Sequence, residues 1–315
     1  MRATLNNVLR EIQDCFASLD GDEFSIHISY YPRNAIGFIG ALAKQFRPGE
    51  ALRVYAVGGD GILFDCLNGI VGLPNVELAA VPYGTSNDWV RAFGDNKKAL
   101  FRNIKLQVSS PSILTDIIHC GNNYALNFCT IGIESDTIMK GITMYNSIPG
   151  DIRKFKKLDT FIYNLIIYIA GAKAVFNKKV LSQYYTISID GEDFSGVFGS
   201  INIANGPCYG GNKNAAITAM PNDGILDVLF FRCSNSLKAA GLVIPYTKGG
   251  FRRFPNNFTL KRIKKIEIHS EEPLLVDLDG EAFFDTSITV RIIPDAVRIV
   301  APGGISYAKM ADSHG

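Results

Sequence analysis

Helical and extended hydrophobic patterns alternate over the first hundred residues. Apolar side chains recur at helical spacing from Leu5 to Leu19, and the same spacing returns over residues 35–46 and 62–70. Between these segments, residues 24–30, 52–57 and 76–81 are apolar or alternating runs that predict strands. Because strands that alternate with helices favour a parallel sheet covered by helices, this part of the chain predicts an α/β domain.

The pattern changes after about Ser110, where most of the predicted elements are short strands. They are predicted over residues 184–189, 199–204, 225–231, 265–269, 274–278 and 287–292. Several alternate apolar and polar side chains, as Ile266-Glu267-Ile268-His269 does. Asp190-Gly191 and Asn222-Asp223-Gly224 supply turn residues between them. We therefore predict a β-rich, antiparallel sandwich domain after the α/β domain.

Composition narrows the classes of protein. The chain of 315 residues is 47% apolar and 20% charged, as expected of a folded globular protein, and its net charge of +2 gives no reason to expect a nucleic acid partner. The cysteines are scattered without a C-x-x-C pair and the histidines are dispersed, so we expect a reducing compartment and no zinc site.

No targeting or membrane-spanning segment is expected. The first residues lack a secretory signal, and the longest apolar stretch, residues 161–176, is interrupted by Asn164 and Lys173. That stretch is shorter than the ~20 residues of a spanning helix. The expected location is the cytoplasm, with a soluble chain.

Three glycines within four residues follow the strand predicted at 52–57. Gly58-Gly59-Asp60-Gly61 lies at the carboxyl end of that strand and directly before a helix. Glycines let the backbone approach a ligand closely, and the start of a helix directs free N–H groups at the same point, which favours a phosphate. A tight turn that needs glycines for geometry alone is the alternative. Asp60 argues against it, because a carboxylate repels a phosphate unless a divalent cation or phosphoryl transfer is involved.

A second polar turn ends the next strand. Pro82-Tyr83-Gly84-Thr85-Ser86-Asn87-Asp88 follows residues 76–81 and precedes a short helical segment that Ser86 or Asn87 could cap. Capping alone explains this turn equally well, but two such turns at successive strand ends together indicate a phosphate site. The patterns G-x-x-x-x-G-K-[ST], G-x-G-x-x-G before a helix, H-R-D and D-F-G are absent. P-loop enzymes, dinucleotide enzymes and protein kinases are therefore not expected.

Taken with later segments, these turns resemble the diacylglycerol kinase catalytic-domain family, which includes soluble bacterial lipid kinases and is related to sphingosine and ceramide kinases. The family patterns G-G-D-G-T, P-x-G-T-x-N-D and a late D-G-E correspond to residues 58–62, residues 82–88 and Asp279-Gly280-Glu281. Residues 203–211 and 221–227 look like the second-domain signatures of the family, so the resemblance covers almost the whole chain.

The resemblance implies a division into two domains. Residues 1–108 with 298–315 would form an α/β nucleotide-binding domain similar to those of NAD kinases and phosphofructokinases. Residues 109–297 would form a β-sandwich lipid-kinase domain, with the active site in the cleft between the two. The family also begins with a strand that ends in N-P-x-S-G, and this first strand is missing from the fold expected here. Either the true start lies upstream of Met1 or part of the nucleotide pocket is lacking, and a missing strand would leave a sheet edge open to another chain.

The resemblance further implies a role for each matched position, with ATP and Mg²⁺ as cofactors. Glu281 would be the general base, worth typically ~10²–10⁴ in rate, and Asp60 and Asp116 would complete the catalytic set near the magnesium ion. A structural divalent ion would be held by Asp223 with the carbonyl oxygens of Met220 and Ile225. The nucleotide would be bound by Gly58, Gly59, Asp60, Gly61, Ile62, Thr85, Asn87, Asp88 and Asp279.

Ile62 departs from the family pattern, because it replaces the threonine of G-G-D-G-T. The lost hydroxyl is worth about 0.5–1.5 kcal/mol as one hydrogen bond to a phosphate. Asp190-Gly191-Glu192 is a second D-G-E, and its position after an alternating strand predicts a hairpin turn and no site.

A kinase for a water-insoluble lipid must contact a membrane, so transient peripheral association is expected. Basic clusters at residues 153–157, 252–254 and 261–265 are the hypothesised contacts, with a solvated charged surface as the alternative for each. The apolar stretch 161–170 is predicted to be a buried helix, and it could also cover a homodimer surface.

The leading hypothesis is a transferase of phospholipid biosynthesis that moves the γ-phosphoryl group of ATP to diacylglycerol or a related lipid alcohol. A kinase for a soluble acceptor such as NAD is the rival enzyme, and the late D-G-E argues against it. A catalytically silent member that binds lipid or a protein partner is an alternative of another class, motivated by Ile62 and the missing strand. Retention of Asp60, Asp223 and Glu281 argues against that alternative.

Overall fold

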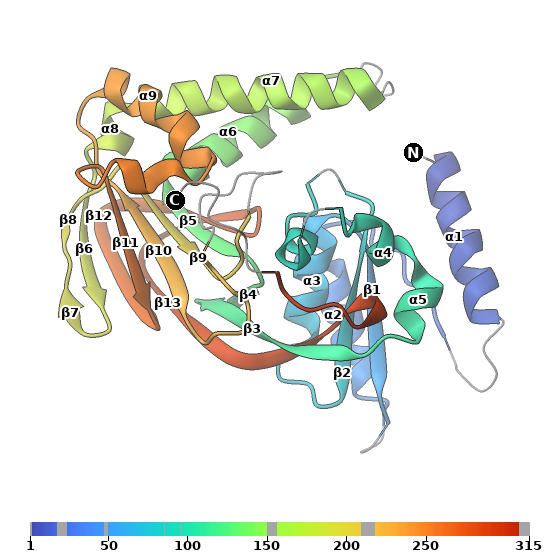
Figure 1. Cartoon of the computed structure of the whole chain (residues 1–315). Helices are drawn as coiled ribbons and strands as arrows, with labels where there is room; N and C mark the ends of the chain where they lie inside the picture. The colour runs from blue at the N-terminus through green and yellow to red at the C-terminus, as the bar shows by residue number, and fades with distance from the viewer. Residues whose placement is uncertain are drawn as a thin grey trace.

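The N-terminal part of the chain forms the α/β arrangement that the hydrophobic pattern predicts. In the computed structural model, which describes residues 2–17, 24–46, 50–84, 86–94, 96–149, 156–208 and 218–308, strands β1 (Leu52–Gly58) and β2 (Val76–Pro82) pair in parallel. Helix α3 (Asp60–Ile70) connects them and packs against α2 (Asn34–Ala43). Helix α1 (Arg2–Ala17) lies at one end of the molecule, beside α5 (Figure 1). The remaining short helices of this part are η1 (Trp89–Phe93), α4 (Lys98–Arg102) and α5 (Ile104–Val108).

The strand predicted over residues 24–30 is wrong. These residues are extended but belong to no ladder, and Phe24, Ile26 and Ile28 are each about 40% exposed, at 44%, 39% and 39%. An alternating pattern makes a strand only where a neighbouring edge supplies hydrogen bonds. Within the described chain no strand pairs with this segment, and β1 is itself an edge strand of the sheet.

The β-rich part is an antiparallel arrangement, as predicted, but two of its strands, β12 and β13, are longer than the short strands that the sequence predicts. One sheet runs in the order β1-β2-β13-β12-β5-β9-β10-β11, with β3 and β4 attached at β13 and β6, β7 and β8 attached at β12. Its strands are β3 (Ser112–Cys120), β4 (Asn123–Ala125), β5 (Phe128–Gly132), β6 (Tyr184–Ile189), β7 (Glu192–Asp193), β8 (Gly196–Val197), β9 (Ser200–Ala204), β10 (Leu226–Phe231), β11 (Phe258–Ile263), β12 (Lys265–Leu278) and β13 (Glu281–Val300).

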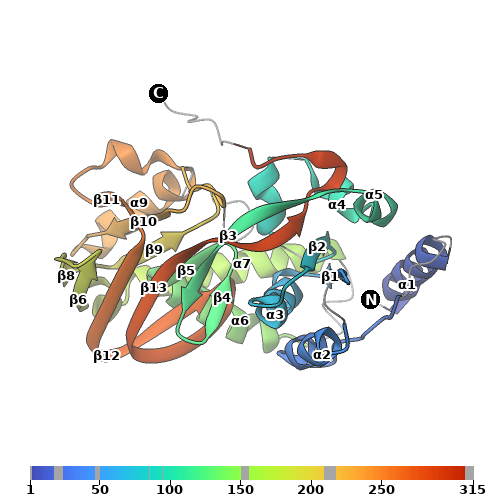
Figure 2. The same ribbon diagram turned by 90° about the horizontal axis from the view of Figure 1, so that it is seen from below.

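Strand β13 joins the two parts of the molecule. It sweeps from the β-rich part, where it pairs with β12, to the α/β part, where Arg298 and Ile299 lie parallel to Glu77 and Leu78 of β2 (Figures 1 and 2). A break in its register with β3 between Ile293 and Val297 lets the strand bend between these partners. The fold class is therefore confirmed, whereas the domain boundaries at 108/109 and 297/298 stay predictions.

The β-rich part is held together from both faces of its sheet. One face buries an apolar cluster that includes Ile118, Ile203, Val228 and Leu278. The other face is covered by helices α6 (Ile133–Asn146), α7 (Lys156–Val175), α8 (Lys178–Leu181) and α9 (Ser236–Thr247), and by the 3₁₀ turn η3 (Gly250–Arg253), as Figure 1 shows. A last 3₁₀ turn, η4 (Pro302–Gly304), follows β13. Among the described residues, no helix has the length and apolar character needed to cross a bilayer.

The buried helix predicted over residues 161–170 is only half buried. Ile166 and Ala170 are buried, but Phe161, Leu165 and Tyr168 on the opposite side of α7 are 64%, 48% and 78% exposed. The sequence contains enough apolar residues for both sides of the helix, whereas the sheet and its neighbouring helices cover one side only.

Candidate active site

The two polar turns touch at the carboxyl ends of β1 and β2. The carbonyl oxygen of Gly58 accepts hydrogen bonds from the N–H groups of Tyr83 and Gly84, at 2.7 and 2.9 Å. The backbones of Gly59 and Gly84 are so close that a Cβ atom on Gly84 would overlap the Cα atom of Gly59. These glycines are therefore needed for close approach of the two turns, at the sheet edge where open α/β sheets bind ligands.

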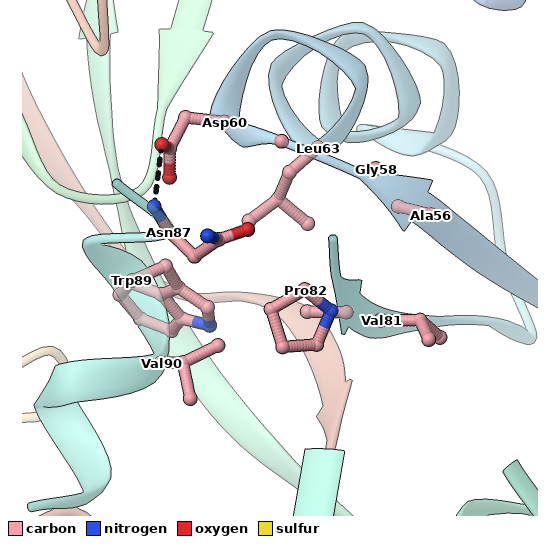
Figure 3. Close-up of a pocket in the computed structure, with 11 residues that line it drawn as sticks. Ala56, Gly58, Asp60, Leu63, Val81, Pro82, Asn87, Trp89 and Val90 are labelled. Atoms are coloured by element: carbon pink, nitrogen blue, oxygen red, sulfur yellow. Dashed lines mark hydrogen bonds between the residues drawn. The ribbon is translucent and has the colours of Figure 1, made fainter. Parts of the chain in front are cut away.

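Asp60 fastens the second turn to the first. Its carboxylate accepts the N–H of Asn87 at 2.8 Å (Figure 3) and the N–H of Asp88 at 3.0 Å. Asn87 in turn closes its own loop, because its side chain accepts the N–H of Gly84 at 3.0 Å and donates to the carbonyl of Gly84 at 2.6 Å. Burial raises the pKa of Asp60, and the N–H groups of Asn87 and Asp88 oppose that rise. Asp60, Asn87 and Asp88 thus form one rigid unit.

A small pocket opens between these turns. It is lined by residues of β1, β2, the second turn and the starts of α3 and η1, including Ala56, Asp60, Pro82, Asn87 and Trp89 (Figure 3). The indole Nε1 of Trp89 is buried and has no hydrogen-bond partner in the part of the chain that the structure describes. A buried donor without a partner at a pocket is consistent with a polar ligand or water there.

The side chain of Ile62 packs over the end of β1. A Cβ atom on Gly58 would collide with Cγ2 of Ile62, and Ile62 belongs to the edge of the apolar core of the α/β part. The isoleucine therefore serves packing in this structure, and its predicted contact with nucleotide stays untested. Thr85 lies outside the described residues.

The late D-G-E forms a two-residue hairpin turn between β12 and β13. Leu278 pairs with Glu281, and Asp279 and Gly280 both have positive φ angles, of 51° and 94°. The carboxylate of Asp279 accepts the N–H groups of Leu126 at 2.7 Å and of Phe128 at 2.9 Å, which anchors the turn to the chain before β5. Asp190-Gly191 forms the same turn between β6 and β7, so its hairpin prediction is confirmed.

Glu281 lies beside the first glycine turn. A Cβ atom on Gly61 would stand 3.6 Å from Oε1 of Glu281, so the carboxylate reaches the start of α3 from the other part of the molecule. Burial raises the pKa of Glu281; the positive charge of Arg33 lowers it and the negative charge of Asp65 raises it. The structure thus brings Gly61 and Glu281 together as the sequence predicted, although their roles are not tested by it.

Arg33 is a site residue that the sequence analysis missed. Its guanidinium donates to Oδ1 of Asn123 at 2.8 Å and lies over the ring of Phe64, 5.1 Å from the centroid. Its backbone N–H donates to Asp65 at 2.7 Å. No motif surrounds Arg33 in the sequence, and only its folded position reveals a cation near Glu281.

Asp116 connects segments of the β-rich part. Its carboxylate accepts the N–H of Gly224 at 2.7 Å and the N–H of Asp295, at the bend of β13, at 2.9 Å. Burial raises the pKa of Asp116, and these two N–H groups oppose the rise. The structure therefore places Asp116 beside the loop that carries Asp223, and its catalytic role stays a prediction.

The predicted divalent-ion site at Asp223 does not fit the contacts seen here. The carboxylate of Asp223 forms an ion pair with the guanidinium of Arg262 and accepts the N–H of Ile225 at 3.1 Å. A cation at this carboxylate would face the positive charge of Arg262. The ion site that would combine Asp223 with the carbonyl oxygens of Met220 and Ile225 therefore stays a prediction.

Comparison with protein families matches two models along the chain. Residues 3–116 match the diacylglycerol kinase catalytic domain, and residues 160–301 match the YegS C-terminal NAD kinase beta sandwich-like domain. A "Putative lipid kinase" of Staphylococcus carnosus is 26% identical over 249 residues, which cover 78% of this chain and 76% of that protein. A second protein with that name, from Staphylococcus aureus strain JH9, is 25% identical over 252 residues with the same shares covered.

Solved structures share the fold. A crystal structure of a diacylglycerol kinase from Bacillus anthracis str. Sterne superposes with a TM-score of 0.67 at 19% identity, over 96% of this chain and 93% of that one. The N-terminal family match contains both glycine turns, and the C-terminal match contains Asp279-Gly280-Glu281. The chain belongs to the diacylglycerol kinase catalytic-domain family.

Proposed function

We propose that the chain transfers the γ-phosphoryl group of ATP, supplied as Mg·ATP, to the hydroxyl of a lipid alcohol such as diacylglycerol. The observation that carries this proposal is the position of Glu281, whose Oε1 lies next to Gly61 of the first glycine turn. A carboxylate beside an anion-binding turn is suited to receive a proton from a hydroxyl that attacks a phosphate there.

In the proposed reaction Glu281 takes the proton of the lipid hydroxyl as its oxygen attacks the γ-phosphorus atom. The bond to the β-phosphate oxygen breaks, and ADP leaves with that electron pair. The magnesium ion enters with the nucleotide and neutralises phosphate charge. The turn at 58–61, at the start of α3, would supply backbone N–H groups for the phosphates, whereas the N–H groups of Gly84, Asn87 and Asp88 in the second turn are paired within the protein and hold the two turns together.

Asp60 acts in this proposal as a positioning residue. Both of its oxygens accept backbone N–H groups of the second turn, so its carboxylate holds the two turns in register. Asp279 serves the D-G-E turn in the same way, through the N–H groups of Leu126 and Phe128. Both carboxylates would thereby hold Glu281 and the phosphate-binding backbone in place.

The proposal is tested by measuring which acceptor receives the phosphoryl group. Purified protein is incubated with Mg·ATP labelled at the γ-phosphate and, separately, with lipid alcohols in mixed micelles and with NAD. Label in a lipid phosphomonoester supports the proposal. Label in NAD phosphate with none in lipid would establish a kinase for a soluble acceptor. Absence of both products, together with absence of ATP binding by calorimetry, would establish a catalytically silent family member.

A further inference from the structure

Helix α7 presents a stripe of apolar side chains to solvent. Phe161, Leu165, Tyr168, Ile169 and Phe176 recur at helical spacing and are 64%, 48%, 78%, 40% and 54% exposed. The opposite side of the helix is already packed, since Ile166, Ala170 and Ala174 are buried. A helix with apolar residues on its outer side leaves a surface that soluble monomeric proteins rarely expose.

Helix α9 continues the same surface. Leu237 and Ile244, two turns apart on α9, are 74% and 65% exposed, and Val243 beside them is 39% exposed. The two helices contact each other, and their inner sides share one buried cluster with α8 and η3. Figure 1 shows α7 and α9 together at the outer edge of the layer that covers the sheet. We call the exposed side chains Phe161, Leu165, Tyr168, Ile169, Phe176, Leu237, Val243 and Ile244 the outer apolar face.

The charged residues in the two sequence segments that carry this face are all basic, whereas Asp159 lies in the first turn of α7 and Asp136 lies on the neighbouring α6. Residues 161–183 and 233–257 contain Lys173, Lys178, Lys179, Lys238, Lys248, Arg252 and Arg253, all exposed, and neither segment contains Asp or Glu. The chain as a whole has 32 basic and 30 acidic residues, so this excess is local. Apolar side chains surrounded by lysine and arginine match the boundary between acyl chains and anionic headgroups. A second copy of the chain on the same face would place like charges against each other.

The three basic clusters noted in the sequence differ in this respect. Residues 153–155 and the side chains of residues 156–157 lie outside the described part of the chain. In the cluster at 261–265, Arg262 pairs with Asp223 and Asp227, and Lys265 pairs with Glu267 at 2.6 Å. The cluster at 252–254 borders α9, and the sequence segment 233–257 that contains both has no Asp or Glu.

Helix α7 also reaches the candidate active site. The phenol of Tyr163, on its inner side, is close enough to Asp88 and Asp60 for their charges to raise its pKa, after the larger effect of burial. A surface that holds α7 would therefore hold the site close to that surface. From these observations we propose that the outer apolar face docks on an anionic lipid bilayer, with its apolar side chains below the headgroups and its basic residues among them.

This inference deepens the proposed lipid kinase activity, but its first test requires no nucleotide. The full chain is sedimented with vesicles of phosphatidylglycerol and phosphatidylcholine, or of phosphatidylcholine alone. The apolar variant carries Leu165→Ser, Tyr168→Ser and Ile244→Ser, and the charge variant carries Lys173→Gln, Lys178→Gln and Lys238→Gln. The control carries Tyr30→Ser and Tyr31→Ser, two tyrosines in the N-terminal part that are 83% and 64% exposed.

We expect the wild type and the control to bind the anionic vesicles alike. The apolar variant should bind at least ~10-fold more weakly, and the charge variant should lose its preference for phosphatidylglycerol and most of its salt dependence. Equal binding by all four proteins, or no binding by the wild type, would overturn the proposal. So would an apolar variant whose only change is the loss of a dimer in sedimentation velocity.

The two proposals fail differently. If the docking face is correct, the apolar variant phosphorylates a short-chain, water-soluble diglyceride like the wild type but loses activity on vesicles. If phosphorylation is absent from every protein while vesicle binding follows the expected pattern, the lipid kinase function is rejected and the docking face stands.

Discussion

The carboxylate of Asp60 and the backbone N–H of Asn87 are 2.8 Å apart and join turns that follow two different strands. The second oxygen of Asp60 accepts the N–H of Asp88 at 3.0 Å, so one side chain satisfies two neighbouring donors. Only an ionised carboxylate offers an acceptor to both at once. Asp60, the first residue of α3, therefore links the two turns through these hydrogen bonds.

Asp60→Asn should weaken the hydrogen bonds that link the two turns. The amide can accept one of the two N–H groups, and its NH₂ group then faces the other, which stays unpaired at a cost of about 1–3 kcal/mol. We expect a lower free energy of unfolding in urea and weaker ATP binding by calorimetry. Asp14→Asn, at an exposed position of α1, is the matched control. An Asp60→Asn protein with wild-type stability and ATP affinity would show that neither depends on this link between the two turns.

Gly84→Ala should destabilise the protein. The added methyl group would overlap the Cα atom of Gly59, and separating the turns should cost about 1–3 kcal/mol. Gly37→Ala is the matched control, because nothing lies within 4 Å of its Cβ position in α2. That change should stabilise by about 0.5–1 kcal/mol. Thermal and urea unfolding measure both, and equal effects of the two substitutions would contradict the close approach of the turns.

Arg33→Gln should shift the pH profile of catalysis. The positive charge of Arg33 lowers the pKa of Glu281, so its removal raises that pKa and leaves the base protonated to higher pH. The acidic limb of kcat should therefore move to higher pH in Arg33→Gln, whereas Arg33→Lys, which keeps the positive charge, should hardly move it. A shift of the acidic limb to lower pH, or the same shift in Arg33→Lys, would mean that the charge of Arg33 does not act on Glu281.

Asp277→Asn should stabilise the protein above neutral pH. Asp277 is buried opposite Thr130 of β5, and neither of its oxygens has a hydrogen-bond partner among the described residues. Burial, and then the charge of Asp279, raise the pKa of Asp277 to about 7. The folded protein therefore binds an extra proton relative to the unfolded chain between about pH 4 and pH 7.

It follows that the contribution of Asp277 to stability falls as pH rises through this window and is least favourable above pH 7. Asp277→Asn should raise the free energy of unfolding by about 1–3 kcal/mol at pH 8 and change it little at pH 4. Urea unfolding at both pH values measures the difference. A stabilisation of equal size at pH 4 would mean that the charge of Asp277 is not its cause.

The sequence predicted the elements whose patterns depend on local chemistry. Strands β1 and β2 and the Asp190-Gly191 hairpin follow from apolar runs and turn residues that act over a few positions, and the helix predicted over residues 62–70 begins two residues earlier, at Asp60. Strands β12 and β13 were predicted only as separate short strands. Polar residues interrupt the apolar alternation of β12 near the break in its register with β13.

Features that depend on distant partners could not be predicted. The extended segment 24–30 has the alternation of a strand but no partner edge, and the outer side of α7 has the composition of a core but no cover. The position of Arg33 beside Glu281 and the ion pair of Asp223 with Arg262 arise from chain segments brought together by folding. In the candidate site, the sequence therefore indicated candidate residues whose roles stay predictions, and it missed the positive charges that lie near them.

The most direct test of the account compares the two D-G-E glutamates. Both follow the same Asp-Gly turn, but Glu281 lies beside Gly61 and Glu192 is exposed on β7. Initial rates of labelled phosphate transfer from Mg·ATP to diacylglycerol in mixed micelles are measured for wild type, Glu281→Gln and Glu192→Gln. We predict a loss of ~10²–10⁴-fold in kcat for Glu281→Gln with folding intact, and wild-type kcat for Glu192→Gln. Equal rates for Glu281→Gln and the wild type would contradict Glu281 as the base and, with it, the proposed mechanism.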